Sequence, residues 1–385
     1  MLIYLLLVSL LLILTLKSLR KSTCCTNNFS KTTTFLLLTN YVFNCIFAFC
    51  AIVVAVRDVF VGTDTILYSR IYNKIILNNF DFNLSPTPAF IYYCVNYFLG
   101  IFFSDSLSIR VFQSVVTYYC FYKIIVKSSE YKFFSLLLFI GFGYFAQSMN
   151  ISRQMMSIAL VLYSAHLLYV DKRISLAIIF WVCAILIHIT SAIALTIPLF
   201  YCMLKKLKSN CYVFLSCTFL ALFVNLIFKY VVFIIAEYVE HYEAYVGSKA
   251  KYNILATNTS GVVAYLFLLY LAIIAIYVFK RPNISKVKNQ FMQVVFPFVI
   301  FLIFCTVFSL LNPFNEMIFR LMLPSYVLLS LIVIPHISSV LSLKEKVIYM
   351  PVILVATIFH FYYILFVINC GEVVPYAFYS ISIND

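Results

Sequence analysis

The chain has 385 residues, of which 64% are apolar and only 10% are charged, and its mean hydropathy is +1.04. Ordinary globular chains are about 45–50% apolar and about 25% charged. A soluble domain of this length could not hide so much apolar surface from water. The composition therefore excludes a soluble enzyme, a disordered chain and a nucleic-acid-binding domain, and it indicates a polytopic helical membrane protein.

Continuous apolar runs long enough to cross a bilayer recur along the chain. They predict an all-α polytopic protein with about 10–12 transmembrane helices in a single integral membrane domain, residues 1–385. The run Ile174–Met203 is too long for one untilted helix, so we expect two short segments hinged near His188, with one tilted helix as the alternative. The runs lie at Leu2–Leu16, Phe35–Val56, Leu107–Val126, Phe133–Met149, Gln154–Val170, Ile174–Met203, Cys211–Ala236, Val262–Phe279, Phe291–Leu311, Met317–Ile334 and Val347–Asn369.

Lys and Arg residues are unevenly divided among the connections between these runs. Eighteen of the 27 lie in alternating connections, which the positive-inside rule assigns to the cytoplasm, so both termini are expected outside. The net charge of +14 fits this rule and contact with anionic membrane lipid. The alternation requires that Thr87–Phe103 does not cross, so we expect an interfacial helix over residues 87–103 within an outer loop over 57–105. A second outer loop is expected over 237–260.

The sequence lacks the usual motifs of metal sites, disulfide frameworks and nucleotide-binding sites. The twelve cysteines form no Cys-x-x-Cys pair and no zinc-site spacing, so we expect neither a metal site nor a disulfide framework. No glycine-rich nucleotide motif is present, so we expect no nucleotide cofactor and no cytoplasmic nucleotide-sugar donor.

Polar residues that are costly at membrane depth collect at the predicted outer face. Each has a simpler explanation: an arginine anchored at the interface, a packing histidine, an Asx turn at Asp64, or a Glu316–Arg320 pair one helical turn apart. Their joint placement favours a polar pocket in the outer leaflet. The residues are Arg57, Asp58, Asp64, Tyr68, Arg153, Gln154, His188, Asn312, Asn315, Glu316 and Arg320.

Such a pocket suits a lipid-linked phosphate. Arginine binds phosphate oxygens through two N–H groups at once and stays charged. A carboxylate or a neutral histidine at the edge of the pocket can accept a proton from a hydroxyl group. These residue types favour glycosyl or phosphoryl transfer from a lipid-pyrophosphate donor at the outer membrane face.

Three sequence patterns carry a family resemblance. They are R-D-x-x-V-G-T-D-T-x-x-Y over Arg57–Tyr68, M-N-I-S-R-Q-x-x-x-I-A-L over Met149–Leu160, and A-x-x-x-H-x-T-S-A over Ala184–Ala192. The chain resembles the EpsG family of polysaccharide polymerases, which are Wzy-type O-antigen or exopolysaccharide polymerases. The resemblance covers about residues 35–335 and includes R-L-M-L-P-S-Y over Arg320–Tyr326.

The resemblance implies a particular reaction. A growing glycan is transferred from undecaprenyl pyrophosphate to the non-reducing end of a lipid-linked repeat unit, at the periplasmic face of the bacterial inner membrane. The implied fold is similar to that of the metal-independent C-type membrane glycosyltransferases. The implied partners are the undecaprenyl-pyrophosphate-linked oligosaccharide and membrane lipid, and contact with a chain-length regulator is left open.

The resemblance also assigns roles to residues. Arg153 and Arg320 would bind pyrophosphate, helped by Arg57 and Gln154. The base that activates the acceptor would be His188, Asp64 or Glu316, with Asp64 and His188 favoured. Tyr68, Tyr92 and Tyr93 would stack on sugars.

Two other functions share some of these features. A polyprenyl-phosphate-sugar glycosyltransferase would use similar arginines, but it usually has a paired acidic motif in its first outer loop. A lipid-linked oligosaccharide flippase would need charges through the depth of the bilayer and often has repeated halves. Neither the acid pair nor a repeat is present in this sequence.

Overall fold

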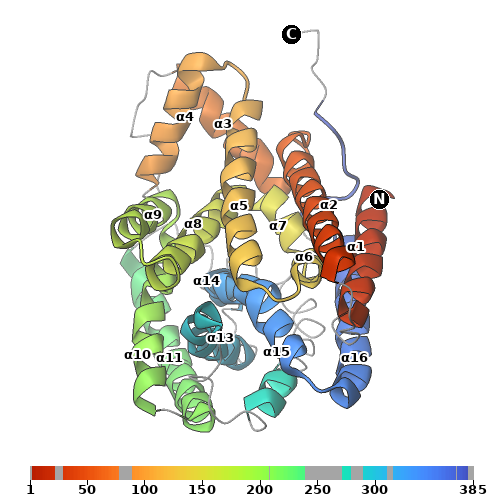
Figure 1. Cartoon of the computed structure of the whole chain (residues 1–385). Helices are drawn as coiled ribbons and strands as arrows, with labels where there is room; N and C mark the ends of the chain where they lie inside the picture. The colour runs from red at the N-terminus through yellow and green to blue at the C-terminus, as the bar shows by residue number, and fades with distance from the viewer. Residues whose placement is uncertain are drawn as a thin grey trace. The chain divides into compact units, whose positions relative to one another are not determined.

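The computed structural model describes residues 2–21, 29–77, 89–207, 209–238, 271–278, 289–309, 315–369 and 371–379. These residues are helical, apart from turns and one isolated antiparallel bridge between Arg57 and Phe378 (Figure 1). The elements are α1 (Leu2–Lys21), α2 (Phe29–Ala55), α3 (Thr63–Leu77), α4 (Phe90–Phe102), α5 (Leu107–Ser128), α6 (Lys132–Gly141), α7 (Tyr144–Asn150), α8 (Ser152–Tyr169), α9 (Ile174–Ile187), η2 (Ile189–Thr196), α10 (Ile197–Leu207), α11 (Asn210–Tyr238), α13 (Gln290–Ser309), α14 (Asn315–Leu328), η5 (Leu329–Val333), α15 (Ile334–Val340), α16 (Leu343–Tyr362) and η6 (Tyr363–Val367).

The described helices confirm a polytopic all-α membrane protein. Five of them are long and apolar enough to span a bilayer, and α6 with α7 makes a sixth if the bent pair counts as one span. The total of about 10–12 spans stays a prediction, as does the single membrane domain. The predicted outer loop over 237–260 lies outside the described residues from residue 239 onward.

The chain forms two compact units. The first contains residues 1–164, 173–189 and 330–385, and the second contains residues 165–172 and 190–329. In the first unit α6 is the central helix, because it packs against α1, α2, α5, α15 and α16. Gly141 of α6 packs closely against Thr357 of α16. A Cβ added at Gly141 would lie 2.2 Å from the Thr357 methyl group, so no larger residue fits there without a shift. Small residues permit such close helix packing where lipid supplies no hydrophobic driving force.

Two predicted membrane runs are broken by their backbone conformation. Gly143 has a φ of +81°, which glycine adopts without steric cost, and α6 and α7 meet there at 59°. Helix α9 ends at Ile187, and His188 has an extended backbone with φ −153° and ψ 114°. The predicted hinge near His188 is therefore confirmed.

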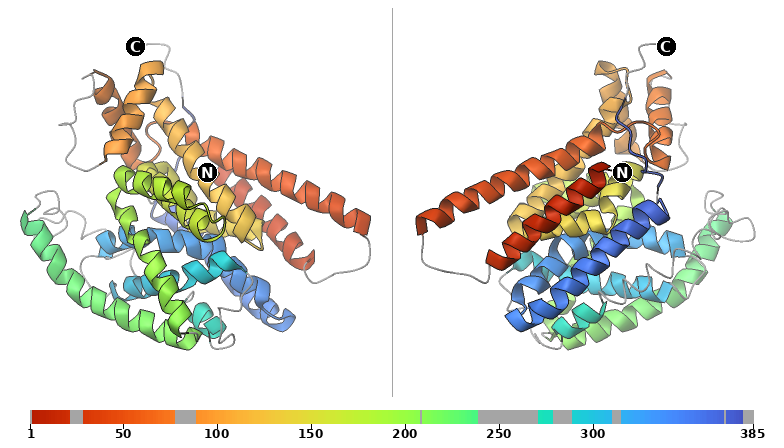
Figure 2. Two further views of the ribbon diagram at one scale, coloured as in Figure 1. Left: turned by 60° about the vertical axis from the view of Figure 1, so that its left-hand side comes forward. Right: turned by 90° about the vertical axis from the view of Figure 1, so that its right-hand side faces the viewer.

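The second unit is built on α13. This helix packs against α10, α11 and α14 (Figure 2). Aromatic rings fill the contact with α10, where the centroids of Phe200 and Phe301 lie 4.6 Å apart.

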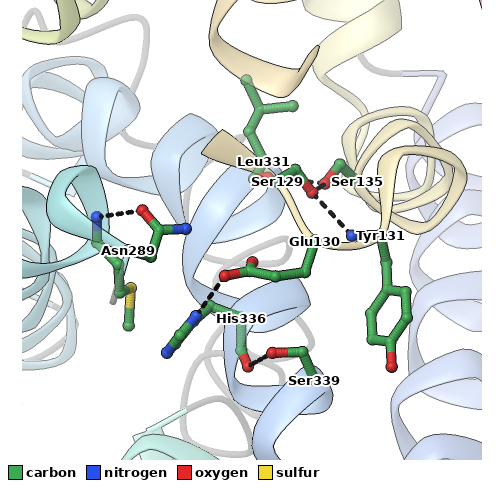
Figure 3. A network of polar contacts seen from close by, with 9 residues as sticks. Ser129, Glu130, Tyr131, Ser135, Asn289, Leu331, His336 and Ser339 are labelled. Atoms are coloured by element: carbon green, nitrogen blue, oxygen red, sulfur yellow. Dashed lines mark hydrogen bonds and ion pairs between the residues drawn. The ribbon is translucent and has the colours of Figure 1, made fainter. Parts of the chain in front are cut away.

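A polar network ties the α5–α6 turn to α15 in the first unit. Nδ1 of His336 lies 2.7 Å from Oε1 of Glu130, and the Ser135 hydroxyl donates to the Leu331 carbonyl at 2.7 Å (Figure 3). His336 is almost fully buried, whereas the Glu130 side chain keeps 30% of its exposure. The contact fixes two segments that are about 200 residues apart in the sequence.

This network should be energetically coupled. We expect Glu130→Ala and His336→Ala each to lower the free energy of unfolding by about 1–3 kcal/mol. Glu130→Ala leaves the buried His336 without this hydrogen bond, and His336→Ala removes both the hydrogen bond and the packing of the buried ring. The double variant should lose less than the sum of the two. Chemical unfolding of the detergent-solubilised protein measures this, with the exposed Lys344→Ala as control. Strictly additive losses would contradict the contact.

Candidate functional site

Arg57 follows the end of α2 and is fully buried. One guanidinium nitrogen donates to the Val54 carbonyl, and Nε donates to the Thr65 hydroxyl at 3.5 Å. The remaining nitrogen, Nη2, has no hydrogen-bond partner among the described residues. Burial, together with the nearby positive charge of Arg110, lowers the pKa of Arg57 to about 9. The site thus contains a buried cation whose hydrogen-bonding capacity is only partly used.

The loop after Arg57 is held against the C-terminal end of α7. Gly62 has a φ of +93°, and a Cβ there would lie 2.9 Å from the Met149 carbonyl oxygen. Asn150 accepts hydrogen bonds from the Thr63 hydroxyl at 2.9 Å and from the Asp64 backbone N–H at 3.0 Å. Asp64 lies in the first turn of α3, and the alternative explanation of it as an Asx turn stays a prediction. A carboxylate is favourable there, where helical N–H groups point outward.

Helix α3 was not predicted, although its sequence contains a signal for it. The buried residues Thr65, Tyr68, Tyr72 and Ile75 recur at spacings of three and four, which is the period of one helix face. The helix lies inside the segment 57–105 that was expected to be a loop. The helix expected at 87–103 corresponds to α4, and its position at a membrane interface stays a prediction.

Arg153 lies close to the predicted tyrosines. Its guanidinium carbon is 5.4 Å from the ring centroid of Tyr92, within range of a cation–π contact. Tyr92 in turn contacts Tyr68 and Tyr93 edge to face, with both centroid distances at 6.1 Å. Burial raises the pKa of Tyr92 to about 12, against the opposing effect of Arg153. The structure therefore brings Arg153 and the three tyrosines together.

Gln154 is buried beside Arg153 in α8. Ser152, the residue before Arg153, donates a hydrogen bond to Oε1 of Gln113 on α5 at 2.8 Å. This hydrogen bond fixes the start of α8 against α5, and Arg153 directly follows it.

His188 is joined to the same helix. The Ser157 hydroxyl donates to the His188 carbonyl at 3.3 Å and to the Ala184 carbonyl at 2.6 Å. Ser157 lies one helical turn beyond Arg153, so the half-buried His188 is at the next turn along α8. Its role as a base stays a prediction.

Glu316 and Arg320 belong to α14, in the second unit. Their side chains lie outside the described part of the structure. Their roles stay predictions, and the first unit holds the other eight predicted site residues.

Two further features of this region were missed. Arg110, in the first turn of α5, is as buried as Arg57. The segment Gly371–Tyr379 lies against the loop after Arg57, with Asp58 N–H donating to the Ala377 carbonyl at 2.9 Å and Tyr379 N–H to the Val56 carbonyl at 2.8 Å (Figure 2). Arg110 could have been noticed as an arginine at the predicted outer end of a membrane run. No local pattern indicated the role of the C-terminal segment.

The described residues define a multi-pass all-α membrane protein whose first unit contains two buried arginines, Arg57 and Arg110. The sequence model of the EpsG family matches residues 40–378, so the chain belongs to the EpsG family. Membership supports a general role as a polysaccharide polymerase. Neither the curated proteins nor the solved structures include a significant match to this chain.

Asn150 should control the order of the loop that carries Asp64. We expect Asn150→Ala to speed hydrogen exchange in residues 57–65 and to cost about 1–2 kcal/mol of stability, because the Asp64 N–H loses its acceptor. Asn150→Asp keeps an acceptor oxygen and should exchange like the wild type. Hydrogen-exchange mass spectrometry distinguishes them, and equal exchange in the alanine variant would contradict this role.

Proposed function

We propose that this protein is a polysaccharide polymerase that transfers a growing glycan from undecaprenyl pyrophosphate to the non-reducing end of a lipid-linked repeat unit at the periplasmic face of the inner membrane. Family membership supports the general role. The observation that carries the proposal is Arg57, a fully buried guanidinium with no ion-pair partner among the described residues. It interacts electrostatically with Tyr68, which contacts the Tyr92 ring beneath Arg153. Such a site favours a ligand that supplies concentrated negative charge.

The reaction needs no chemistry beyond these residue types. A hydroxyl oxygen of the acceptor sugar attacks the anomeric carbon of the donor, and the bond from that carbon to the pyrophosphate oxygen breaks. The hydroxyl proton passes to a base, and undecaprenyl pyrophosphate leaves with the bonding electron pair. Arginines that bind the pyrophosphate stabilise the negative charge that develops on it.

The roles of the remaining residues follow from this reaction. Asp64 and His188 are the favoured candidates for the base, with Glu316 as the third. Arg153 and Arg57, with Gln154 and Arg320, bind the pyrophosphate. Tyr68, Tyr92 and Tyr93 supply aromatic faces on which sugar rings stack.

The test is the surface-polysaccharide pattern of a strain that lacks this chain. The proposal expects a single repeat unit on the acceptor in the deletion strain, and a full ladder only when the intact chain is returned. A deletion strain with no repeat unit at all would place the protein earlier, as a flippase or a glycosyltransferase that adds single sugars. A normal ladder in the deletion strain would also overturn the proposal.

Arg153 offers a sharper test of the site. We expect Arg153→Ala to reduce polymerisation about 100-fold, in line with the loss of a group that stabilises charge in the transition state. Arg153→Lys should still lose about tenfold, because an ammonium group does not replace a two-pronged guanidinium. The ladder is scored at equal amounts of membrane-inserted protein.

The exposed Arg173, at the start of α9, provides the matched control, and Arg173→Ala should leave the ladder unchanged. Full activity in Arg153→Lys would show that charge alone suffices. Full activity in Arg153→Ala would remove Arg153 from the site.

A further inference from the structure

Arg110 is a buried charge to which the proposed reaction has assigned no role. It keeps only 1% of its exposure, and Nε and Nη2 have no hydrogen-bond partner among the described residues. Its only hydrogen bonds in this part of the chain are long ones, from Nη1 to the hydroxyls of Ser69 at 3.3 Å and Ser106 at 3.4 Å. Arg110 therefore has two free donor groups in a region protected from water.

Helix α3 brings Arg110 next to Arg57. Arg57 contacts Thr65 and Arg110 contacts Ser69, and these two residues are four apart on the same helix. Residues at this spacing are neighbours on a helix face, with Cβ atoms about 5–6 Å apart. The two guanidinium groups are close enough for Arg110 to lower the pKa of Arg57. Two like charges thus contact one face of α3 at positions one helical turn apart.

Neither arginine is neutralised by an ion pair within the described residues. The carboxylates of Asp105 and Asp58 act on Arg110 electrostatically but do not hydrogen-bond to it. Asp105 instead accepts from the Leu107 N–H at 2.7 Å and from the Tyr379 hydroxyl. Burying two cations without partners is unfavourable, because each loses its hydration. A bound dianion would supply the missing charge and accept the unused N–H groups.

Tyr379 covers this pair. The Arg110 guanidinium carbon lies 5.0 Å from the Tyr379 ring centroid, and the adjacent Phe378 forms the backbone bridge with Arg57. The hydrogen bond to Asp105 holds the Tyr379 hydroxyl and raises its pKa. Phe378 itself is 62% exposed, so the cover is a single layer of chain at the surface of the unit.

We infer that Arg57 and Arg110 form a two-arginine binding site for a pyrophosphate group, and that Tyr379 occupies its entrance when the site is empty. In this arrangement each guanidinium binds one of the two linked phosphoryl groups. Tyr379 leaves Arg110 when the anion arrives, because a doubly charged ligand outcompetes a cation–π contact. The inference deepens the proposed function, which supplies the identity of the ligand as a lipid-linked pyrophosphate.

Binding to the purified full-length chain in detergent tests the inference without requiring turnover. The probes are inorganic pyrophosphate and farnesyl pyrophosphate, measured by isothermal titration calorimetry. We expect Arg110→Gln to weaken both by at least about tenfold, in line with the loss of a charge-assisted hydrogen-bond pair. The control is Arg70→Gln, which removes an exposed arginine next to Ser69 on α3 and should leave both affinities unchanged.

Removing the Tyr379 side chain should strengthen pyrophosphate binding, whereas removing the Arg110 charge should weaken it. Tyr379→Ala should tighten pyrophosphate binding by about two- to fivefold, because the empty site no longer keeps the cation–π contact. Tyr379→Phe keeps the ring and should show a smaller gain. The two probes distinguish the source of the anion: tighter binding of farnesyl pyrophosphate indicates a lipid carrier, and tighter binding of inorganic pyrophosphate indicates a free anion.

A purely structural role for Arg110 predicts that Arg110→Gln lowers the unfolding temperature. The anion site predicts the same unfolding temperature as the wild type or a higher one, because an unpartnered buried cation costs stability. If the glutamine variant does not fold, Arg110→Lys replaces it and should bind about tenfold more weakly than the wild type. Wild-type affinity in whichever variant folds would overturn the inference.

The outcomes for the site and for the polymerase are separate. Lost pyrophosphate binding in Arg110→Gln, together with a normal ladder in the deletion strain, would support the anion site and refute the polymerase. Unchanged binding in Arg110→Gln, together with a lost ladder in the deletion strain, would refute the anion site and leave the polymerase standing.

Discussion

The desolvation of two neighbouring guanidinium groups is the constraint on which the first unit depends. Arg57 and Arg110 are removed from water without forming an ion pair in the described part of the chain. The free-energy cost of desolvating them has to be offset by favourable packing around them. The elements that pack there are α2, α3, α5 and the C-terminal segment. The same free energy becomes available to a ligand that supplies negative charge. Stability and affinity are therefore linked at these two side chains.

Hydrogen bonds to backbone groups join several of the elements around the site. The loop after α2 is joined to the C-terminal segment, where Gly62 N–H donates to the Glu372 carbonyl at 3.2 Å and Thr63 N–H to the Gly371 carbonyl at 3.1 Å. Tyr4 of α1 adds a third element, because its hydroxyl donates to the Val373 carbonyl at 3.0 Å. These contacts place both described ends of the chain and the first loop at one end of the unit. The predicted alternation of loops assigns all of them to a common side, and which side faces outward stays a prediction.

Local sequence patterns predicted much of this arrangement. Apolar runs predicted the membrane helices, and the polar break at His188 predicted the end of α9. The isolated arginines at the ends of runs led to Arg57 and Arg153, which the structure places in one region. The family motifs led to the family that the whole-chain comparison shows. Each of these signals is contained within a dozen residues.

The parts that were missed depend on tertiary contacts. Arg110 sits four residues into an apolar run, where it resembles an ordinary interfacial anchor until α3 is placed beside it. The segment Gly371–Tyr379 has the composition of a terminal tail, and only its pairing with the loop near Arg57 shows that it belongs to this region. Pairings over such sequence distances leave no periodic pattern to read.

The pairing of Asp58 with Ala377 also has a consequence for biosynthesis. More than 300 residues separate the two partners, so this contact forms only after nearly all the membrane helices have been made and inserted. Until then the Tyr379 ring cannot make its contact with the Arg110 guanidinium. The contact between the loop after α2 and the C-terminal segment is therefore among the last to form, and a chain that stalls before residue 377 would lack it.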